Sequence, residues 1–288
     1  MKPHTHCGPC ILKWIYERQS GPLNDAQRFE MQRKVMSVLS RDLGPSINLA
    51  ALTNRCLEAV EEFRPASSDR YLRFKADCNQ AASELLGDAK NFVENGKTRR
   101  DRFARACAIA AMGNVAPIGA PSAPFGFSHV EEIIRGKAPL PSITGDVSEA
   151  VSQAHHVLYV ADNAGEIGFD SLLISLLKEE GLTVTLIVKQ GPFFDDATVN
   201  DASCFGLDSI ADEILAVKGF FVPGDAPAGP ADAFAASDLV ISKGTGNWES
   251  LKNDTGGKTT VFMLKAKCPP VSEEMATEIG DFIVQVEK

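Results

Sequence analysis

Short apolar runs that alternate with helical stretches constrain the fold of this 288-residue chain more than any other feature. The runs HVLYVA, TVTLIV, EILAV, DLVIS and TVFML lie at residues 156–161, 183–188, 213–217, 238–242 and 260–264. Helical stretches, such as FDSLLISLLKEEG and ATVNDASCFGL, separate them. Strands that alternate with helices build a parallel sheet with helices on both faces. Residues 139–288 are therefore predicted to form an α/β domain, a three-layer αβα structure with a mostly parallel sheet of about five strands.

The chain before this alternation has a helical pattern. In residues 46–63 apolar side chains recur every three or four positions, and Ser46 or Asn48 is available as the N-cap. Two further helical segments, at 71–96 and 102–114, are ended by Gly96 and Gly113. We therefore expect a helical N-terminal or cap domain at residues 1–138 and the α/β domain at 139–288.

Charge is divided unevenly between these two parts. Residues 1–138 carry 20 Lys and Arg against 15 Asp and Glu, whereas residues 139–288 carry 9 against 23. The net charge of -9 argues against a general nucleic-acid binder, and a basic part facing an acidic part would suit an anionic substrate between them. Two separately solvated surfaces would carry the same charges, so charge alone decides nothing.

The sequence also predicts where the protein is found. No run approaches the ~20 apolar residues of a membrane span. The N-terminus lacks the apolar core of a signal peptide, so we expect a cytoplasmic protein. The seven scattered cysteines do not indicate a disulfide framework, and Cys56 and Cys107 fall in apolar helical stripes, where buried thiols are expected.

Polar residues follow the first two predicted strands, at the edge where parallel sheets bind ligands. They are Asp162, Asn163, Gly165 and Glu166 after the first run, and Asp195 and Asp196 after the second. Carboxylate and amide oxygens suit a hard cation such as Mg²⁺ or Mn²⁺. Helix N-caps use the same residue types, so both interpretations stay open at this point.

Lysines follow the fourth and fifth predicted strands. Lys243 opens the segment KGTGN, which resembles an anion-binding loop without P-loop spacing, and Lys265 and Lys267 follow the last run. Exposed lysines are common at such positions. Acids at two strand ends with lysines at two others nevertheless form a phosphatase layout, in which the acids hold a cation and the lysines neutralise phosphoryl charge. No GxSxG, Walker, HExxH or GxGxxG motif points to another enzyme class.

Motifs with a common order and spacing extend over nearly the whole chain. They occur here as CGPC, SDRYLRFKADCN, the pair Gly113-Asn114, VADNAGE, GPFFDDAT, SDLVISKGTGNWE and LKAKCP. Together they resemble the metal-dependent damage-control phosphatases, the acidic-residue methyltransferase-like family formerly known only as a domain of unknown function. The short form with a CxxC pair resembles the prokaryotic branch of that family.

The resemblance implies a role for individual residues. The family's metal ligands correspond to Asp162, Asn163 and Asp196, and its phosphate-binding lysine corresponds to Lys265. Glu166, close to these ligands in sequence, is expected to orient water or a sugar hydroxyl. The residues expected to bind the substrate or shape its pocket are Lys243, Gly244, Gly246, Asn247, Asn114, Asp69, Lys75 and Asn79. Arg70 and Pro117 depart from the family's pattern, which puts the substrate in question.

The N-terminal segment HTHCGPC allows three interpretations. Cys7 and Cys10 offer thiolates for an accessory metal site, although a lone CxxC lacks the second pair of a typical zinc site. A thioredoxin-like redox role would need a preceding strand, and none is predicted. The segment would otherwise only begin a helix.

The resulting hypothesis is an enzyme that hydrolyses small phosphomonoesters by metal-activated water. Asp162, Glu166 and Lys265 are its predicted catalytic residues. The predicted cofactor is a divalent cation, Mn²⁺, Mg²⁺, Co²⁺ or Ni²⁺. The predicted partner is a small phosphorylated metabolite, either a sugar phosphate or a damaged phosphometabolite. Neither nucleic acid nor a membrane is a predicted partner. The alternative is a non-enzymatic metal-binding regulatory protein. A methyltransferase is disfavoured because no adenosyl-binding pair of motifs is found.

Overall fold

A single sheet of seven strands forms the centre of the computed structural model. The structure describes residues 1, 3–63, 69–114 and 126–288, and at residues 69 and 70 it describes the backbone alone. The strands are β1 (Ser142–Thr144), β2 (His156–Val160), β3 (Thr183–Lys189), β4 (Glu213–Val217), β5 (Leu239–Lys243), β6 (Thr259–Lys265) and β7 (Phe282–Glu287). Their order is β1-β7-β6-β5-β2-β3-β4, and only β6 and β7 pair antiparallel. The predicted fold class is confirmed.

Two of these strands were not predicted. β1 has three residues, too few to show a period. β7 pairs antiparallel with β6 across the short helix that follows β6, and the strand–helix alternation of a parallel sheet does not predict such a pairing. β7 covers one side of β6, which matters below because it changes the surroundings of Lys265.

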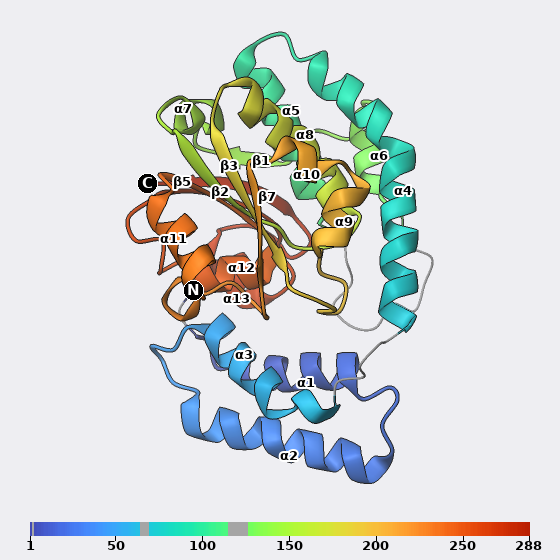
Figure 1. The fold of residues 1–288 in the computed structure, drawn as a ribbon, viewed down its shortest axis with the longest axis vertical. Helices are drawn as coiled ribbons and strands as arrows, with labels where there is room; N and C mark the ends of the chain where they lie inside the picture. The colour runs from blue at the N-terminus through green and yellow to red at the C-terminus, as the bar shows by residue number, and fades with distance from the viewer. Residues whose placement is uncertain (2, 64–68, 115–125) are drawn as a thin grey trace.

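Helices cover both faces of the sheet (Figure 1). One face is covered by α4 (Asp69–Glu94), α5 (Arg99–Met112), α6 (Ser128–Ile134), α7 (Val147–Ser152), α8 (Glu166–Glu179), α9 (Val199–Cys204) and α10 (Leu207–Ile210). The opposite face is covered by α11 (Ala228–Ala236), α12 (Gly244–Leu251) and α13 (Pro269–Glu274). Strand side chains alternate between the two cores: Val157 and Tyr159 face the first, and Leu158 and Val160 face the second.

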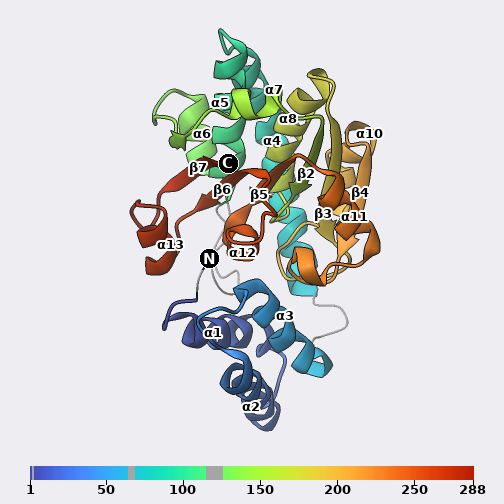
Figure 2. The same cartoon turned by 90° about the vertical axis from the view of Figure 1, so that its left-hand side faces the viewer.

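The N-terminal helices divide into two groups with different surroundings. Helices α1 (Cys7–Gln19), α2 (Asp25–Asp42) and α3 (Leu49–Ala59), here called the cap, lie together at one end of the sheet (Figures 1 and 2). Helices α4 and α5 instead pack on α8, and α5 also contacts β6 and β7. The predicted division at residue 138 stays a prediction, but the helices before it do not form one bundle.

One side chain both begins α3 and holds it to the α/β part. The side chain of Asn48 accepts a hydrogen bond from the N–H of Ala51 at 3.1 Å, so Asn48 rather than Ser46 is the N-cap. Its Nδ2 donates to the carbonyl of Ser250 on α12 at 2.8 Å. A local capping residue therefore also places the cap against the sheet.

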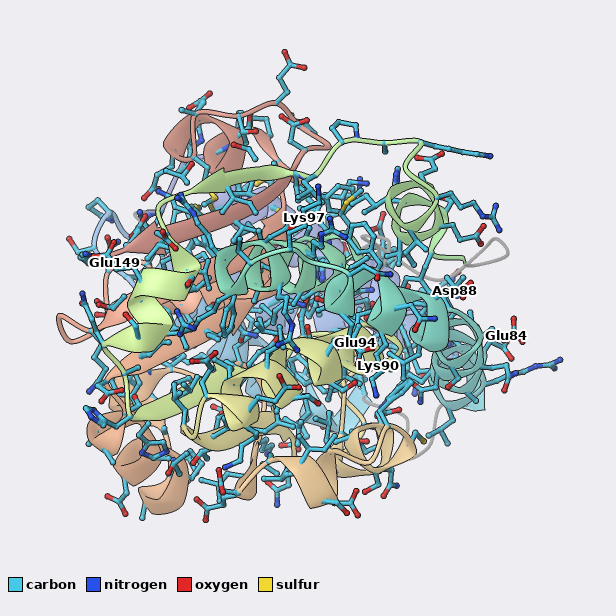
Figure 3. All side chains as sticks on the ribbon, turned by 90° about the horizontal axis from the view of Figure 1, so that it is seen from above. Glu84, Asp88, Lys90, Glu94, Lys97 and Glu149 are labelled. Atoms are coloured by element: carbon cyan, nitrogen blue, oxygen red, sulfur yellow. The ribbon has the colours of Figure 1, made fainter. Side chains whose placement is uncertain are left out.

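The far end of the molecule is a solvated, charged surface. Figure 3 shows this end from above, with side chains of α4, of the turn after it and of α7 on the outside. The residues labelled there are all exposed: Glu84, Asp88, Lys90, Glu94, Lys97 and Glu149. The opposite side of α4 contributes Ala82, Ala89 and Val93 to the core. In the described part of the chain, no helix is long and apolar enough to cross a membrane.

Candidate active site

Backbone pairing holds together two loops at the carboxyl edge of the sheet. Asn163, in the loop after β2, forms an isolated antiparallel bridge with Asp196, in the loop after β3. Beside it, the N–H of Ala197 donates to the carbonyl of Asp162 at 2.8 Å. The three predicted metal ligands therefore lie side by side at the edge where parallel sheets bind ligands.

Hydrogen bonds orient two of these ligands. Asp162 Oδ2 accepts from Nδ2 of Asn114 at 2.7 Å and from Nδ2 of Asn163 at 2.8 Å. The same two nitrogens donate to Oε2 of Glu166 at 2.9 and 2.8 Å. Because the nitrogen of Asn163 faces the two carboxylates, the carbonyl oxygen of its amide is the atom left for a ligand.

Two glycines of the KGTGN segment make room at the site. Gly244 has φ +78°, and a Cβ on it would lie 1.9 Å from Oδ2 of Asp162. A Cβ on Gly246 would lie 2.3 Å from the ring of Phe220. Both glycines predicted to bind substrate are thus at the site, where their missing side chains permit close packing.

A cavity of about 330 Å³ opens in front of these residues. From the α/β part its lining includes Asp162, Asn163, Asp195, Asp196, Thr245, Gly246, Glu249 and Lys267. From the cap it includes Cys7, Cys10, Trp14, Arg18, Leu49 and Thr53. The cavity is therefore enclosed between the sheet edge and the cap, and its volume suits a small metabolite rather than a polymer.

Burial raises the pKa of both acidic ligands. Burial and the nearby charge of Glu166 raise the pKa of Asp162 to about 6. The pKa of Asp196 rises to about 8, because burial outweighs the attraction of Lys189. Two desolvated carboxylates that repel each other favour either protonation or a bound cation.

Two cations beside the acids were missed by the sequence analysis. Nζ of Lys189 lies 3.4 Å from Oδ2 of Asp196, and a guanidinium nitrogen of Arg18 lies 3.3 Å from Asp195; all four side chains are nearly buried. Lys189 carried a detectable signal, a charge at the end of an apolar strand. Arg18 carried none, because only the tertiary packing of α1 brings it to the site.

The residues present fit a divalent cation. Oδ2 of Asp196 is buried without a hydrogen-bond partner, and Asp162, Asn163 and Asp196 together offer two carboxylates and an amide oxygen. Within the described ranges, no three His, Cys, Asp or Glu side chains are grouped as a metal site. A cation here would therefore depend on the amide of Asn163 and on ligands from outside the chain.

Lys243, Glu166 and Asn247 lie beneath the site rather than in the cavity. Lys243 and Glu166 are fully buried and form an ion pair with an Nζ–Oε1 distance of 2.5 Å. Burial would lower the pKa of Lys243, but the carboxylates of Asp170 and Glu166 outweigh it and raise that pKa. Nδ2 of Asn247 donates to the carbonyls of Ala161 and Lys243 at 3.0 and 2.9 Å. The structure thus gives these predicted catalytic and substrate-binding residues supporting positions.

The two lysines after β6 have different surroundings. Lys267 lines the cavity, and its charge lowers the pKa of Asp162 against the larger effect of burial. Nζ of Lys265 instead lies 4.8 Å from the ring centre of Phe282 on β7, and Lys265 is not part of the lining. The structure therefore places Lys267, and not the predicted Lys265, beside the candidate ligands.

The α4 residues predicted to shape the pocket support the loops instead. Nζ of Lys75 lies 2.6 Å from Oδ2 of Asp201, and Nδ2 of Asn79 donates to Oδ1 of the same residue at 2.9 Å. Oδ1 of Asn79 also accepts from the N–H of Gly165 at 2.7 Å. The side chain of Asp69 and all of Pro117 lie outside the described part.

The CxxC pair lies at the start of α1, in the wall of the cavity. Three free thiols line the cavity, those of Cys7, Cys10 and Cys268. The sequence did not connect Cys268 with the CxxC pair. Burial raises the pKa of each of the three thiols. A helix start is observed, and the possible accessory metal site at Cys7 and Cys10 stays a prediction.

We predict that the metal-free protein loses stability as pH rises from about 4 to about 8. An unfolded Asp releases its proton near pH 4, whereas folded Asp196 keeps its proton up to about pH 8. The native state therefore binds more protons in this window, and the free energy of unfolding falls with rising pH. Asp196→Asn removes the buried charge and should raise Tm above the wild-type value at pH 8, but not at pH 4.

Thermal unfolding followed by circular dichroism in excess chelator, at several pH values, tests this dependence. Asp208→Asn is the matched control, because Asp208 is exposed on α10. It should follow the wild-type profile. An Asp196→Asn protein with a lower Tm than wild type at pH 8 would contradict the assigned cause.

We predict that Gly244→Ala disrupts the site beyond its effect on the backbone. Alanine at a positive φ costs about 1–2 kcal/mol wherever it occurs. Gly181→Ala is the matched control, since Gly181 has φ +82° and nothing within 4 Å of an added Cβ. In urea unfolding Gly244→Ala should cost more than the control, and only Gly244→Ala should weaken Mn²⁺ binding, because Asp162 must move. Equal costs and equal Mn²⁺ affinities would disprove the close approach.

Comparison with known proteins agrees with this geometry. The family model of the damage-control phosphatase ARMT1-like domain matches residues 4–283. A damage-control phosphatase of Archaeoglobus fulgidus is 28% identical over 99% of both chains, and one of Pyrococcus horikoshii is 29% identical over 75% of this chain and 74% of its own. The crystal structure of a DUF89 family protein from Pyrococcus horikoshii has the same fold, with a TM-score of 0.79 at 23% identity and 100% coverage of both chains.

The matched range contains the cap, both ligand loops and the KGTGN segment. The family resemblance predicted from the motifs is confirmed, and the prokaryotic CxxC branch stays a prediction. The chain belongs to the family of damage-control phosphatase ARMT1-like domains.

Proposed function

We propose that this protein is a metal-dependent phosphatase that hydrolyses small phosphomonoesters. The observation that carries the proposal is one cavity lined by two carboxylates and an amide, those of Asp162, Asp196 and Asn163, together with Lys267. An oxygen-ligand set beside a cation side chain suits a phosphoryl group, which needs positive charge on several sides. Relatives named damage-control phosphatases support a phosphatase role.

Asp162, Asn163 and Asp196 would hold the cation. When bound, a divalent cation supplies Lewis-acid polarisation of the phosphoryl group and lowers the pKa of water. Carboxylate and amide oxygens accept Mg²⁺, Mn²⁺, Co²⁺ and Ni²⁺ alike, so metal availability would choose among them.

The remaining lining residues bind and enclose the substrate. Lys267 neutralises phosphoryl charge, and Thr245 and Gly246, in the first turn of α12, line the same cavity. Trp14 and Arg18 on α1 line the cavity from the cap side, where they would limit the access of bulk water to a bound phosphoryl group.

The substrate class follows from size and charge. A cavity of about 330 Å³ suits one small phosphorylated metabolite, such as a sugar phosphate or a damaged phosphometabolite. Nucleic acid is not the proposed partner, because the cavity holds only a small molecule and the net charge is -9.

We predict phosphate release that requires both a divalent cation and Asp162. Metal-stripped protein is incubated with an aryl phosphate and a panel of sugar phosphates, and each cation is added back in turn. Turnover should return with metal and vanish in Asp162→Ala, whereas Asp208→Ala, which changes an exposed acid, should behave as wild type. Metal binding without any phosphate release would instead favour the alternative of a regulatory protein. An Asp162→Ala variant that keeps its activity would show that Asp162 is not the metal ligand assumed here.

We predict that Lys267→Ala impairs phosphate binding and that Lys265→Ala does not. Loss of one charged hydrogen bond to the phosphoryl group should raise KM, and the Ki of inorganic phosphate, by about 10- to 100-fold. Lys265→Ala is the matched comparison, with the same chemical change two residues away and no place in the cavity lining. If Lys265→Ala weakened phosphate binding more than Lys267→Ala, Lys265 would be the phosphate-binding lysine, as the family motif implies.

A further inference from the structure

Lys243 is a buried cation directly beneath the candidate site. Its ammonium group donates to Oε1 of Glu166 at 2.5 Å, to Oδ1 of Asp170 at 2.6 Å and to the carbonyl of Ala110 at 2.9 Å. A lysine ammonium has three N–H donors, and these acceptors use all of them. All three charged side chains are fully buried. Lys243 therefore has no donor left for a phosphoryl group.

The same carboxylate connects Lys243 to the ligands. Oε1 of Glu166 faces Lys243, and Oε2 accepts from the amide nitrogens of Asn163 and Asn114. Those nitrogens also donate to Asp162. A carboxylate oxygen accepts hydrogen bonds and does not donate them, so Glu166 holds both amide nitrogens on its own side. For Asn163, the side chain carbonyl is then turned the other way.

We propose that Lys243 is a positioning residue that, through Glu166, fixes the amide orientation of Asn163 and the carboxylate of Asp162 for cation binding. This inference rests on the proposed function. It differs from the substrate-binding role that the KGTGN motif suggested, because it places the effect of Lys243 on the affinity for metal rather than for phosphate. Outer partners of metal ligands typically change metal affinity by about 10- to 100-fold when removed.

The test measures Mn²⁺ binding directly, by calorimetry in the absence of substrate. Lys243→Met should weaken Mn²⁺ affinity by about 10- to 100-fold. At saturating Mn²⁺ the Ki of inorganic phosphate should stay at the wild-type value. If Lys243 bound the phosphoryl group instead, the Ki would rise and the Mn²⁺ affinity would not change, and that result would overturn the proposal.

Glu166→Gln keeps the size of the side chain and decides the question if Lys243→Met does not fold. Because Lys243 donates to one end of this side chain, a glutamine would turn its oxygen to Lys243 and its Nε2 toward Asn163. Two N–H groups would then oppose each other, and Mn²⁺ affinity should fall as in Lys243→Met. Wild-type Mn²⁺ affinity in a folded Glu166→Gln would also overturn the proposal.

Tyr159→Phe is the control for general damage to this buried network. The hydroxyl of Tyr159 donates at 2.8 Å to Oδ1 of Asp170, the oxygen to which Lys243 also donates, and has no hydrogen bond to Glu166. Tyr159→Phe should have a lower Tm than wild type and an unchanged Mn²⁺ affinity. If it lost as much Mn²⁺ affinity as Lys243→Met, the stability of the network, and not positioning by Lys243, would be responsible. Wild-type protein that binds no divalent cation would overturn the proposed function itself, whereas equal Mn²⁺ affinity in wild type and Lys243→Met overturns this inference alone.

Discussion

The backbone bridge between Asn163 and Asp196 is the constraint on which the site depends. It forces the loops after β2 and β3 together and so brings the half-buried carboxylate of Asp162 beside the buried carboxylate of Asp196. Desolvated like charges are unfavourable, and the raised pKa values of both groups express that cost. The cation proposed to bind here would offset that cost.

Much of the remaining structure offsets this concentration of negative charge. Lys189 approaches Asp196, Arg18 approaches Asp195, and Lys243 is surrounded by two further acids in the layer beneath. Each cation comes from a different element: the end of β3, the cap and the end of β5. Buried ion pairs of this kind add little net stability, but losing one partner is costly because the other charge remains buried. The site is therefore coupled to both cores of the molecule and to the cap.

The sequence was sufficient for features that follow from strand periodicity. Parallel strands end at one edge, so Asp162, Asn163 and Asp196 were expected close together, and the structure brings them together. For Lys243, strand periodicity predicts the face of the sheet but not the partners of the side chain. Counting in twos from Leu239 and Ile241 places Lys243 toward the α5 and α8 side, but only tertiary packing shows that Glu166 and Asp170 receive it there.

The surroundings of Lys265 also depend on tertiary structure. A lysine at a strand end was expected to face a ligand, but β7 was not predicted, and the ring of Phe282 on β7 occupies the space beside Lys265. Two residues further on, past the end of the strand, Lys267 reaches the cavity. Strand ends thus identified the correct edge of the sheet, whereas the choice between neighbouring lysines depended on a strand pairing that no local pattern reveals.

The position of the cap is set by polar contacts rather than by a shared apolar core alone. Asn54 on α3 makes two hydrogen bonds to the backbone of Phe220, donating to its carbonyl at 3.0 Å and accepting from its N–H at 2.9 Å. The ring of Phe220 lines the cavity and packs where Gly246 lacks a side chain. One bidentate contact therefore fixes both the distance of the cap from the sheet and the aromatic wall of the cavity. α3, an element that contributes no group to the proposed chemistry, therefore helps to set the shape available to a substrate.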